Sequence, residues 1–372
     1  MPLRVLELVR HFAADPRFEA HLFVTRDGPL AREARACGAA VHLLHFCRLR
    51  SPRTPLPFAA FVLTLPAALI RLARELVRLR IDCIHFADFI DHPFYPAARI
   101  CGVRVVAHLR TTFKSAPARF WYRLWSKWCA DVTICISAAV RASATPGAGT
   151  TELIYDPGPS PGLFDPDRTD PGPLLPPFNG VTITTIAKFL EVKGHDLLVT
   201  TARLVVDHAR TPVRFVIVGD RAPGHEPFYA QVLKQIEQSG LRNQMIITGQ
   251  VPYEQIPGLL RCTSIFVHLP RYHEGLGGVI LEAMAMRCAV VAFDSGGCSE
   301  CFEQGISGFA VPHLDCAQAA QTIIELCDNT SLRERVGAAA RLHVRAHFGR
   351  DLFFERIGAI YFRLVYPAEA PV

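Results

Sequence analysis

Short apolar runs alternate with helix-length segments along nearly the whole chain. The runs at 103–107, 215–218 and 288–293 are rich in valine, isoleucine and alanine. Such continuous apolar runs are typical of parallel strands that are buried on both faces. Their alternation with helix-length segments therefore predicts parallel α/β sheets.

The chain is long enough for two domains of ordinary size. It has 372 residues, half of them apolar, and this length exceeds what a single core usually supports. Eight prolines fall between Pro157 and Pro177 with few periodic apolar positions, which predicts an extended linker. The predicted division is an N-terminal domain at 1–160, a proline-rich linker at 161–180, a second domain at 181–348, and a C-terminal helix and tail at 349–372.

The beginning of the chain and its cysteines favour a cytoplasmic protein. Residues 1–20 have the pattern of an amphipathic helix, so no cleavable secretory signal is expected. Most of the twelve cysteines lie inside apolar segments and are interpreted as small buried hydrophobic residues. Cys298 and Cys301 form a single C-x-x-C without a second pair, so free thiols are favoured over a zinc or redox site. A reducing compartment follows.

The segment from Glu274 to Glu282 combines two carboxylates with a glycine-rich turn. Glu274 lies on the turn, and Glu282 follows eight residues later inside a predicted helix. Gly275, Gly277 and Gly278 let the backbone approach a ligand closely, and the first amides of the helix form an anion site. One carboxylate can hold sugar hydroxyls and the other a ribose, with a diphosphate between them. The alternative is a helix with a glycine-rich start and one buried glutamate.

The surroundings of this segment resemble a known enzyme family. A strand-like run precedes Glu274, and a second strand after the helix leads to a Gly-Gly turn at 295–300, a further phosphate cradle. The spacing of the glutamates, the Glu-Ala-Met-Ala sequence and the Gly-Gly turn resemble the family-4 glycosyltransferases, also called glycosyl transferases group 1. These are retaining enzymes of the GT-B architecture. The resemblance implies two Rossmann-like α/β domains with a cleft between them and a C-terminal helix that crosses back to the first domain.

The resemblance also assigns residues to the sugar-nucleotide donor. The segment 183–194 resembles the family's stretch that ends in Lys-Gly, whose two basic residues hold the donor diphosphate. Lys188 and Lys193 occupy those positions, and Lys188 replaces a usual arginine, so a bidentate contact becomes a point charge. Taken alone, they would be two surface lysines flanking a turn. Glu274 is expected to position the sugar as a catalytic residue, and the remaining donor contacts come from Gly275, Leu276, Gly277, Gly278 and Glu282.

The N-terminal domain departs from the family at its beginning. The family's domain normally starts with a strand and a glycine-containing loop, whereas this chain starts with the pattern of the following helix. Two explanations stay open: a start assigned too late, or a truncated and weakened relative. His108 ends the strand-like run 103–108 at the position of the family's cleft histidine, which makes it the second candidate catalytic residue. A histidine at a strand end can equally be structural.

Trp121, Trp125 and Trp128 have the spacing of one helix face, with basic residues between them. Together with a net charge of +6, this face suits a helix that lies on anionic lipid as a peripheral membrane contact. The alternative, which is commoner at this spacing, is that the indoles pack onto the sheet. The uncharged stretch 54–70 contains three prolines and predicts a buried or interfacial helix.

Asp165 and Asp167 form a D-x-D pattern, which binds metal in a different glycosyltransferase architecture. Within the proline-rich linker no strand holds them beside a diphosphate, so they are interpreted as turn residues, and no metal site is expected.

The sequence therefore predicts a metal-independent retaining glycosyltransferase. The resemblance implies a nucleotide-diphosphate sugar as donor substrate with no other cofactor, a glycan or lipid-linked acceptor, and no nucleic acid as a partner. The expected location is the cytoplasm, at the inner face of the cytoplasmic membrane if the tryptophan face contacts lipid. Fixed charge from Lys188 and Lys193, with the helix amides, would stabilise the leaving diphosphate. The alternatives are a catalytically weak sugar-nucleotide binder and a GT-B enzyme of another activity, such as a sugar-nucleotide 2-epimerase.

Overall fold

The chain folds into two compact units. The structure is a computed structural model that describes residues 2–44, 55–113, 116–144, 150–172 and 174–367. The proline-rich segment 161–180 belongs to the second unit, together with a short piece that lies earlier in the sequence. Unit 1 consists of Met1–Cys135, Ser143–Ile154 and Phe354–Val372, and unit 2 consists of Ile136–Ala142 and Tyr155–Phe353.

Unit 1 is an α/β unit with two parallel sheets. A pair of strands forms one sheet, and four strands in sequence order form the other. The central strand β4 is buried along almost its whole length, as its run of valine and alanine predicts. The strands of unit 1 are β1 (His21–Val24), β2 (Ala40–Leu43), β3 (Cys83–Phe86), β4 (Arg104–Leu109), β5 (Val132–Cys135) and β6 (Thr150–Leu153).

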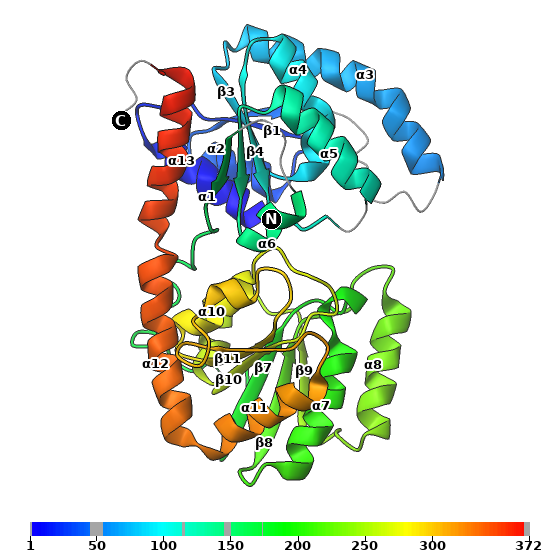
Figure 1. Cartoon of the computed structure of the whole chain (residues 1–372), viewed down its shortest axis with the longest axis vertical. Coiled ribbons are helices and arrows are strands. Elements are labelled where there is room, and N and C mark those ends of the chain that lie inside the picture. Colours follow the sequence, from blue (N-terminus) through cyan, green and yellow to red (C-terminus); the bar gives the residue numbers. More distant parts are fainter. Residues whose placement is uncertain (1, 45–54, 114–115, 145–149, 173, 368–372) are drawn as a thin grey trace. The chain divides into compact units, whose positions relative to one another are not determined.

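Helices pack against these strands (Figure 1). The first of them is the amphipathic helix predicted at the start of the chain. The final helix α13 begins in unit 2, but from Phe354 onward its residues belong to unit 1. There Phe354 stacks on His11 of α1 with ring centroids 4.1 Å apart. The helices are α1 (Pro2–Ala14), α2 (Pro29–Ala36), α3 (Pro55–Arg78), η1 (Phe89–Phe94), α4 (Tyr95–Ile100), α5 (Ala116–Cys129) and α13 (Arg350–Val365). The short helix α6 (Ala138–Ala144) begins in unit 2 and ends in unit 1.

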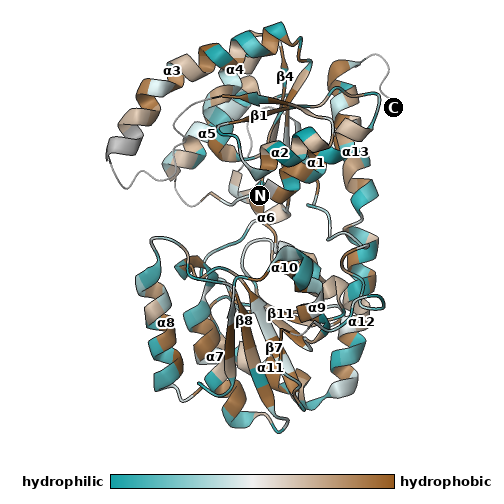
Figure 2. Cartoon of the chain, turned by 180° about the vertical axis from the view of Figure 1, so that it is seen from behind, coloured by the Kyte–Doolittle hydropathy of each residue, from teal (hydrophilic) through white to brown (hydrophobic). Residues whose placement is uncertain are grey.

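Unit 2 contains one six-stranded parallel sheet in the order β12-β11-β10-β7-β8-β9. Figure 2 shows its strands mainly in the brown of hydrophobic residues. This agrees with the continuous apolar runs in the sequence, which a parallel sheet covered on both faces requires. The strands are β7 (Val181–Ile186), β8 (Val213–Val218), β9 (Met245–Gly249), β10 (Ile265–His268), β11 (Ala289–Phe293) and β12 (Phe309–Val311).

The two faces of this sheet form two separate apolar cores. Side chains on one face, such as Phe215 and Val267, pack against α7, α8 and α11. Those on the other face, such as Val216 and Phe266, pack against α9, α10 and α12. The helices are η2 (Glu191–Lys193), α7 (His195–His208), α8 (Glu226–Gln238), η3 (Tyr253–Gln255), α9 (Ile256–Arg261), α10 (Gly278–Ala285), η4 (Ser299–Cys301), α11 (Cys316–Asp328) and α12 (Thr330–His347). Both units therefore have the predicted Rossmann-like α/β architecture.

Candidate functional site

Two loops of unit 2 begin at the carboxyl ends of neighbouring strands. β7 pairs with β10, while β8 and β9 extend to one side and β11 and β12 to the other. The strand order therefore reverses between β7 and β10, and ligands bind beyond the strand ends at such a switch point. The loop after β7 carries Lys188 and Lys193, and the loop after β10 carries Glu274. The topology thus places both predicted segments at one edge of the sheet.

Lys193 and Glu274 form an ion pair between these loops. Lys193 Nζ lies 2.6 Å from Glu274 Oε1, and both side chains are partly buried. Gly194 has a φ of +68°, and a Cβ there would come within 2.0 Å of the Leu269 carbonyl oxygen. Glycine therefore lets the first loop approach the second closely. An ion pair between Arg271 and Asp196 joins the second loop to the first turn of α7.

The turn at Ser295–Gly297 packs against the Glu274 loop. Glu274 and Gly296 form a parallel bridge, and the Gly297 N–H donates to the Glu274 carbonyl at 3.0 Å. A Cβ on Gly296 or on Gly297 would come within 2.1 Å of a carbonyl oxygen of Glu274 or Gly275. The Gly297 amide expected to cradle a phosphate is thus occupied by the loop beside it.

The free amides belong instead to residues 275–277. Within the part of the chain that the structure describes, the N–H groups of Gly275, Leu276 and Gly277 have no acceptor. The N–H of Gly278 differs from the expectation, since it donates to the Leu276 carbonyl at 3.0 Å. Consecutive amides without acceptors, directly before the N-terminus of a helix, are the donors with which proteins bind anions.

We expect Gly297→Ala to displace this loop and destabilise unit 2 by about 2 kcal/mol, because its new methyl group would overlap the Gly275 carbonyl oxygen. Urea denaturation measures the change. Gly172→Ala is the matched control, since a Cβ there meets nothing within 4 Å. Equal stability of the two variants would contradict the close packing of the loop.

Glu282 lies inside α10 and is 9% exposed. The Tyr253 hydroxyl donates to its Oε1 at 3.2 Å. A tyrosine hydroxyl can donate a hydrogen bond to this carboxylate and keep it oriented in a mostly apolar helix. The prediction that Glu282 binds a ribose stays a prediction.

Lys188 and His108 are the remaining predicted residues. Lys188 follows β7 and its side chain is exposed. His108 lies in unit 1 at the end of β4 and is fully buried. Its Nδ1 is 3.0 Å from His85 Nε2, and His85 in turn contacts the Tyr361 hydroxyl of α13 at 2.5 Å. Burial lowers the pKa of His108 well below its ordinary value. The catalytic role of His108 stays a prediction.

Glu300 is a polar anchor that the sequence analysis did not single out. Its carboxylate accepts hydrogen bonds from the N–H groups of Ala138 and Ala139 at 2.7 and 2.8 Å, and from the Tyr155 hydroxyl at 3.1 Å. All four residues belong to unit 2. Because a carboxylate stabilises exposed amides at a helix start, Glu300 holds the beginning of α6 against the Gly-Gly turn. Its position three residues after Gly297 was the signal available in the sequence.

The helix α5 does not bury the tryptophan face. Its buried side chains are Tyr122, Ser126 and Cys129, whereas Trp121 and Trp128 are 50% and 66% exposed. The expectation that the indoles pack onto the sheet, the commoner outcome at this spacing, is therefore wrong for these two residues. Tyr122 occupies that place, with its hydroxyl 3.3 Å from the Thr133 hydroxyl.

The helix α3 next to α4 is also apolar on its outer side, where Leu63 is 79% exposed and Ile70 54%. Across the described ranges, no helix has the length and apolarity needed to cross a bilayer.

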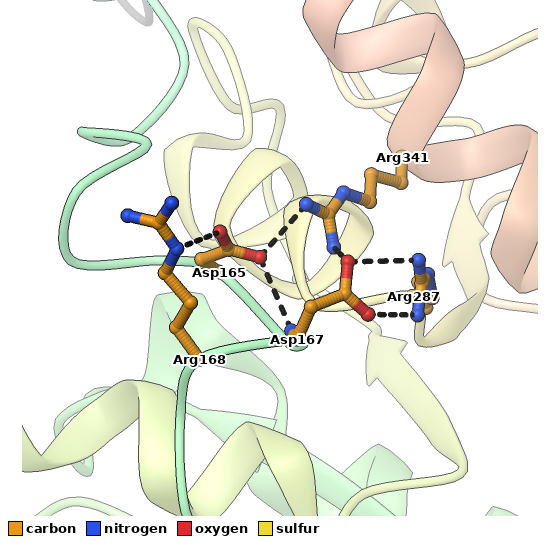
Figure 3. A network of polar contacts seen from close by, with 5 residues as sticks. All are labelled: Asp165, Asp167, Arg168, Arg287 and Arg341. Atoms are coloured by element: carbon orange, nitrogen blue, oxygen red, sulfur yellow. Dashed lines mark hydrogen bonds and ion pairs between the residues drawn. The ribbon is translucent and has the colours of Figure 1, made fainter.

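Asp165 and Asp167 are held by arginines (Figure 3). Arg341 of α12 contacts Asp165 at 2.8 Å and Asp167 at 3.0 Å, and Arg287 contacts Asp167 at 2.7 Å. The Arg341 side chain is only 7% exposed. The proline-rich segment is thereby fixed to the end of α10 and to α12. The eleven cysteines of the described ranges, including Cys298 and Cys301, are free thiols.

Comparison with known proteins identifies the family. The model of the family described as "Glycosyltransferase Family 4" matches residues 3–153, and that of "Glycosyl transferases group 1" matches residues 169–343. The chain belongs to the family-4 glycosyltransferases. The second match covers both loops of the site in unit 2.

This chain spans about half the length of the named relatives that it matches. An alpha-D-kanosaminyltransferase of Streptomyces kanamyceticus is 31% identical over 47% of this chain and 44% of the relative. A GDP-mannose-dependent alpha-(1-6)-phosphatidylinositol monomannoside mannosyltransferase of Mycobacterium tuberculosis is 28% identical over 59% of both chains.

Solved structures share the fold over nearly the whole chain. A glycosyltransferase from Rickettsia africae has a TM-score of 0.81 at 18% identity and covers 98% of this chain and 95% of its own. HepE from Anabaena, solved in complex with UDP, has a TM-score of 0.79 at 19% identity and covers 96% and 95%. These likenesses establish the GT-B architecture that the sequence predicts.

Proposed function

We propose that the protein is a retaining glycosyltransferase that moves a sugar from a nucleotide-diphosphate sugar to a glycan or lipid-linked acceptor. The observation that carries this proposal is the Lys193–Glu274 pair beside the three free amides of 275–277. A lysine and consecutive amides suit a diphosphate, and a neighbouring carboxylate suits sugar hydroxyls. Relatives named as glycosyl- and mannosyltransferases support the same activity.

In the proposed reaction, the bond between the anomeric carbon and the diphosphate oxygen breaks as the acceptor oxygen attacks. Negative charge develops on the diphosphate, where Lys193, Lys188 and the amides of 275–277 stabilise it electrostatically. The acceptor hydroxyl proton passes to the departing phosphate oxygen. Glu274 orients the sugar through its hydroxyls, and Glu282 holds the ribose. The acceptor attacks from the face that the diphosphate leaves, so the configuration of the sugar is retained.

Fixed positive charge takes the place of a divalent ion in this proposal. Lys193 is already positioned by Glu274, and the only D-x-D of the chain is bound by Arg341 and Arg287 instead of facing the site. A lysine acts as a point charge on phosphate, as a divalent ion does. Transfer should therefore proceed unchanged in EDTA.

The test is a donor screen on the purified protein with UDP-, GDP- and ADP-sugars. Alkyl glycosides and a lipid extract serve as acceptors, and the release of the nucleotide measures turnover. At least one donor should support turnover. Proton NMR of the product should show the anomeric configuration of the donor. Inversion of that configuration would overturn the retaining mechanism, and absence of turnover with every donor would overturn the proposed activity.

We also propose that α3 and α5 hold unit 1 on an anionic lipid surface, at the inner face of the cytoplasmic membrane. The exposed Trp121 and Trp128 alternate with the exposed cations Arg123 and Lys127 on α5. Indoles prefer the interface between headgroups and acyl chains, and each nearby cation adds attraction to anionic lipid. A lipid-linked acceptor would be presented at such a surface.

We expect the double variant W121S/W128S to lose most of its binding to vesicles that contain phosphatidylglycerol, by about tenfold. Co-sedimentation measures the bound fraction. The control is Tyr366→Ser, which removes an exposed aromatic ring outside α3 and α5. Equal binding of the two variants would contradict the lipid-contacting face.

A further inference from the structure

The Glu274 carboxylate lies between a cation and a buried histidine. Its Oε1 is 2.6 Å from Lys193 Nζ and 3.8 Å from His268 Nε2. His268 is the last residue of β10, at the switch point of the sheet, and its side chain is 3% exposed. In the described part of the chain, His268 Nε2 has no hydrogen-bond partner.

An unpartnered polar atom is unusual at this depth. Buried nitrogen and oxygen atoms in folded proteins nearly always have a partner, and each one without a partner destabilises the fold. A buried atom of this kind that points at a functional carboxylate therefore suggests a second arrangement in which the contact is made. The 3.8 Å separation exceeds a hydrogen bond of about 2.9 Å by roughly 1 Å, which a small rotation of the Glu274 side chain covers.

His268 has the correct protonation for such a contact. Burial lowers the pKa of His268 to about 4, and the nearby Glu274 carboxylate opposes this shift only in part. The imidazole is therefore neutral at pH 7 and carries one N–H, which can lie on Nε2. A neutral donor can hold a carboxylate without competing with Lys193 for the diphosphate.

Lys193 has two tasks in the proposed function. Its ammonium group holds Glu274 in the structure, and the diphosphate of a sugar nucleotide would attract the same group. When the lysine turns toward the phosphates, Glu274 loses this contact at 2.6 Å. A further donor to the carboxylate would then help to keep its rotamer fixed for the sugar hydroxyls.

We propose that His268 is a positioning residue that donates a hydrogen bond from Nε2 to Glu274 when Lys193 engages the donor diphosphate, and so aims the carboxylate at the sugar. This inference rests on the proposed function above. It assigns the contact with the sugar to Glu274, which His268 holds in place, and the contact with the diphosphate to Lys193 and the amides of 275–277.

The test compares His268→Gln with His268→Met. Glutamine keeps an N–H donor at a similar reach, whereas methionine fills a similar volume without a donor. We expect His268→Met to lower kcat by about 10- to 100-fold with a change of less than threefold in the KM for the sugar nucleotide. His268→Gln should restore kcat to within about fivefold of the wild type. The affinity for the free nucleoside diphosphate should be the same in all three proteins.

His195→Gln is the matched control. This histidine is equally buried and lies two residues from Lys193, but it stacks on Phe189 and its Nε2 contacts the Ala187 carbonyl. Its kcat should stay within about threefold of the wild type. Equal loss of kcat in the glutamine and methionine variants of His268, or no loss in either, would overturn the inference while the wild type stays active. A wild type that transfers sugar from no donor would overturn the proposed function, and this inference with it.

Discussion

Glu274→Gln is expected to lower kcat by about 100-fold or more while the protein remains folded. The substitution keeps the size of the side chain and removes its charge, so Lys193 loses its partner at 2.6 Å and the sugar loses its carboxylate. Losing one preorganised group of this kind costs about 100- to 1,000-fold in rate in other enzymes. Nucleotide release measures kcat, and circular dichroism confirms the fold.

The matched control is Glu191→Gln, which makes the same chemical change at an exposed position two residues before Lys193. Its kcat should equal that of the wild type. Lys193→Met should also lower turnover severely. Because Lys193 and Glu274 contact each other, the double variant should lose less than the product of the two single losses. Full activity of both single variants would remove the basis for the assigned site.

Arg341→Met is expected to lower the melting temperature by roughly 5–10 °C, the largest stability effect that the structure predicts. Arg341 is nearly buried and bridges Asp165 and Asp167, so the variant removes the cation that the two carboxylates share. The two aspartates join the proline-rich segment to α12 and, through Arg287, to the end of α10. Loosening this contact should also raise the KM for the donor, since α10 carries Glu282.

Arg168→Met is the control for that variant. Arg168 contacts Asp165 at 3.8 Å from a side chain that is 87% exposed, and such surface pairs contribute little. Differential scanning calorimetry compares the variants. A melting temperature of Arg341→Met equal to that of Arg168→Met would show that the buried arginine holds nothing together.

The stabilisation that the contact between Asp165 and Arg341 provides also depends on pH. The Asp167 N–H and the Arg341 guanidinium hold the pKa of Asp165 below its ordinary value. A carboxylate with a lowered folded-state pKa stabilises the fold fully above its unfolded pKa. That contribution is lost as the pH falls through the lowered value. In Arg341→Met the acid-induced loss of stability should accordingly be smaller than in the wild type.

Local patterns in the sequence were sufficient for the fold and for the Glu274 loop. The apolar runs predicted the parallel strands, because a strand buried on both faces has no polar positions to break its pattern. The glycines of 275–278 predicted a close approach to a ligand, which stays a prediction, while the close backbone contacts of this region lie at Gly194, Gly296 and Gly297. The amide of Gly278 was assigned to the ligand, yet it bonds to Leu276, since the choice between the two depends on local dihedral angles that a motif does not encode.

Contacts between distant segments were not predictable in the same way. Glu300 binds amides 162 and 161 residues away, and Arg341 reaches aspartates 176 and 174 residues away. Nothing in the residues near Asp165 indicates that an arginine of α12 will bind it. The two interpretations of the tryptophan face stayed open for a related reason, since helical spacing shows that three residues share a face but does not show which face packs inward. In α5 the face that packs inward carries the smaller side chains of Tyr122, Ser126 and Cys129.

The central claim is that unit 2 binds a sugar nucleotide by its diphosphate through Lys193 and the amides of 275–277. Isothermal titration calorimetry in EDTA, with UDP-, GDP- and ADP-sugars on the wild type and on Lys193→Met, tests it most directly. At least one donor should bind the wild type. Lys193→Met should lower the affinity for that donor at least tenfold, while the corresponding nucleoside binds both proteins equally. Binding of every donor with the same affinity in the two proteins, or of none to the wild type, would contradict the account.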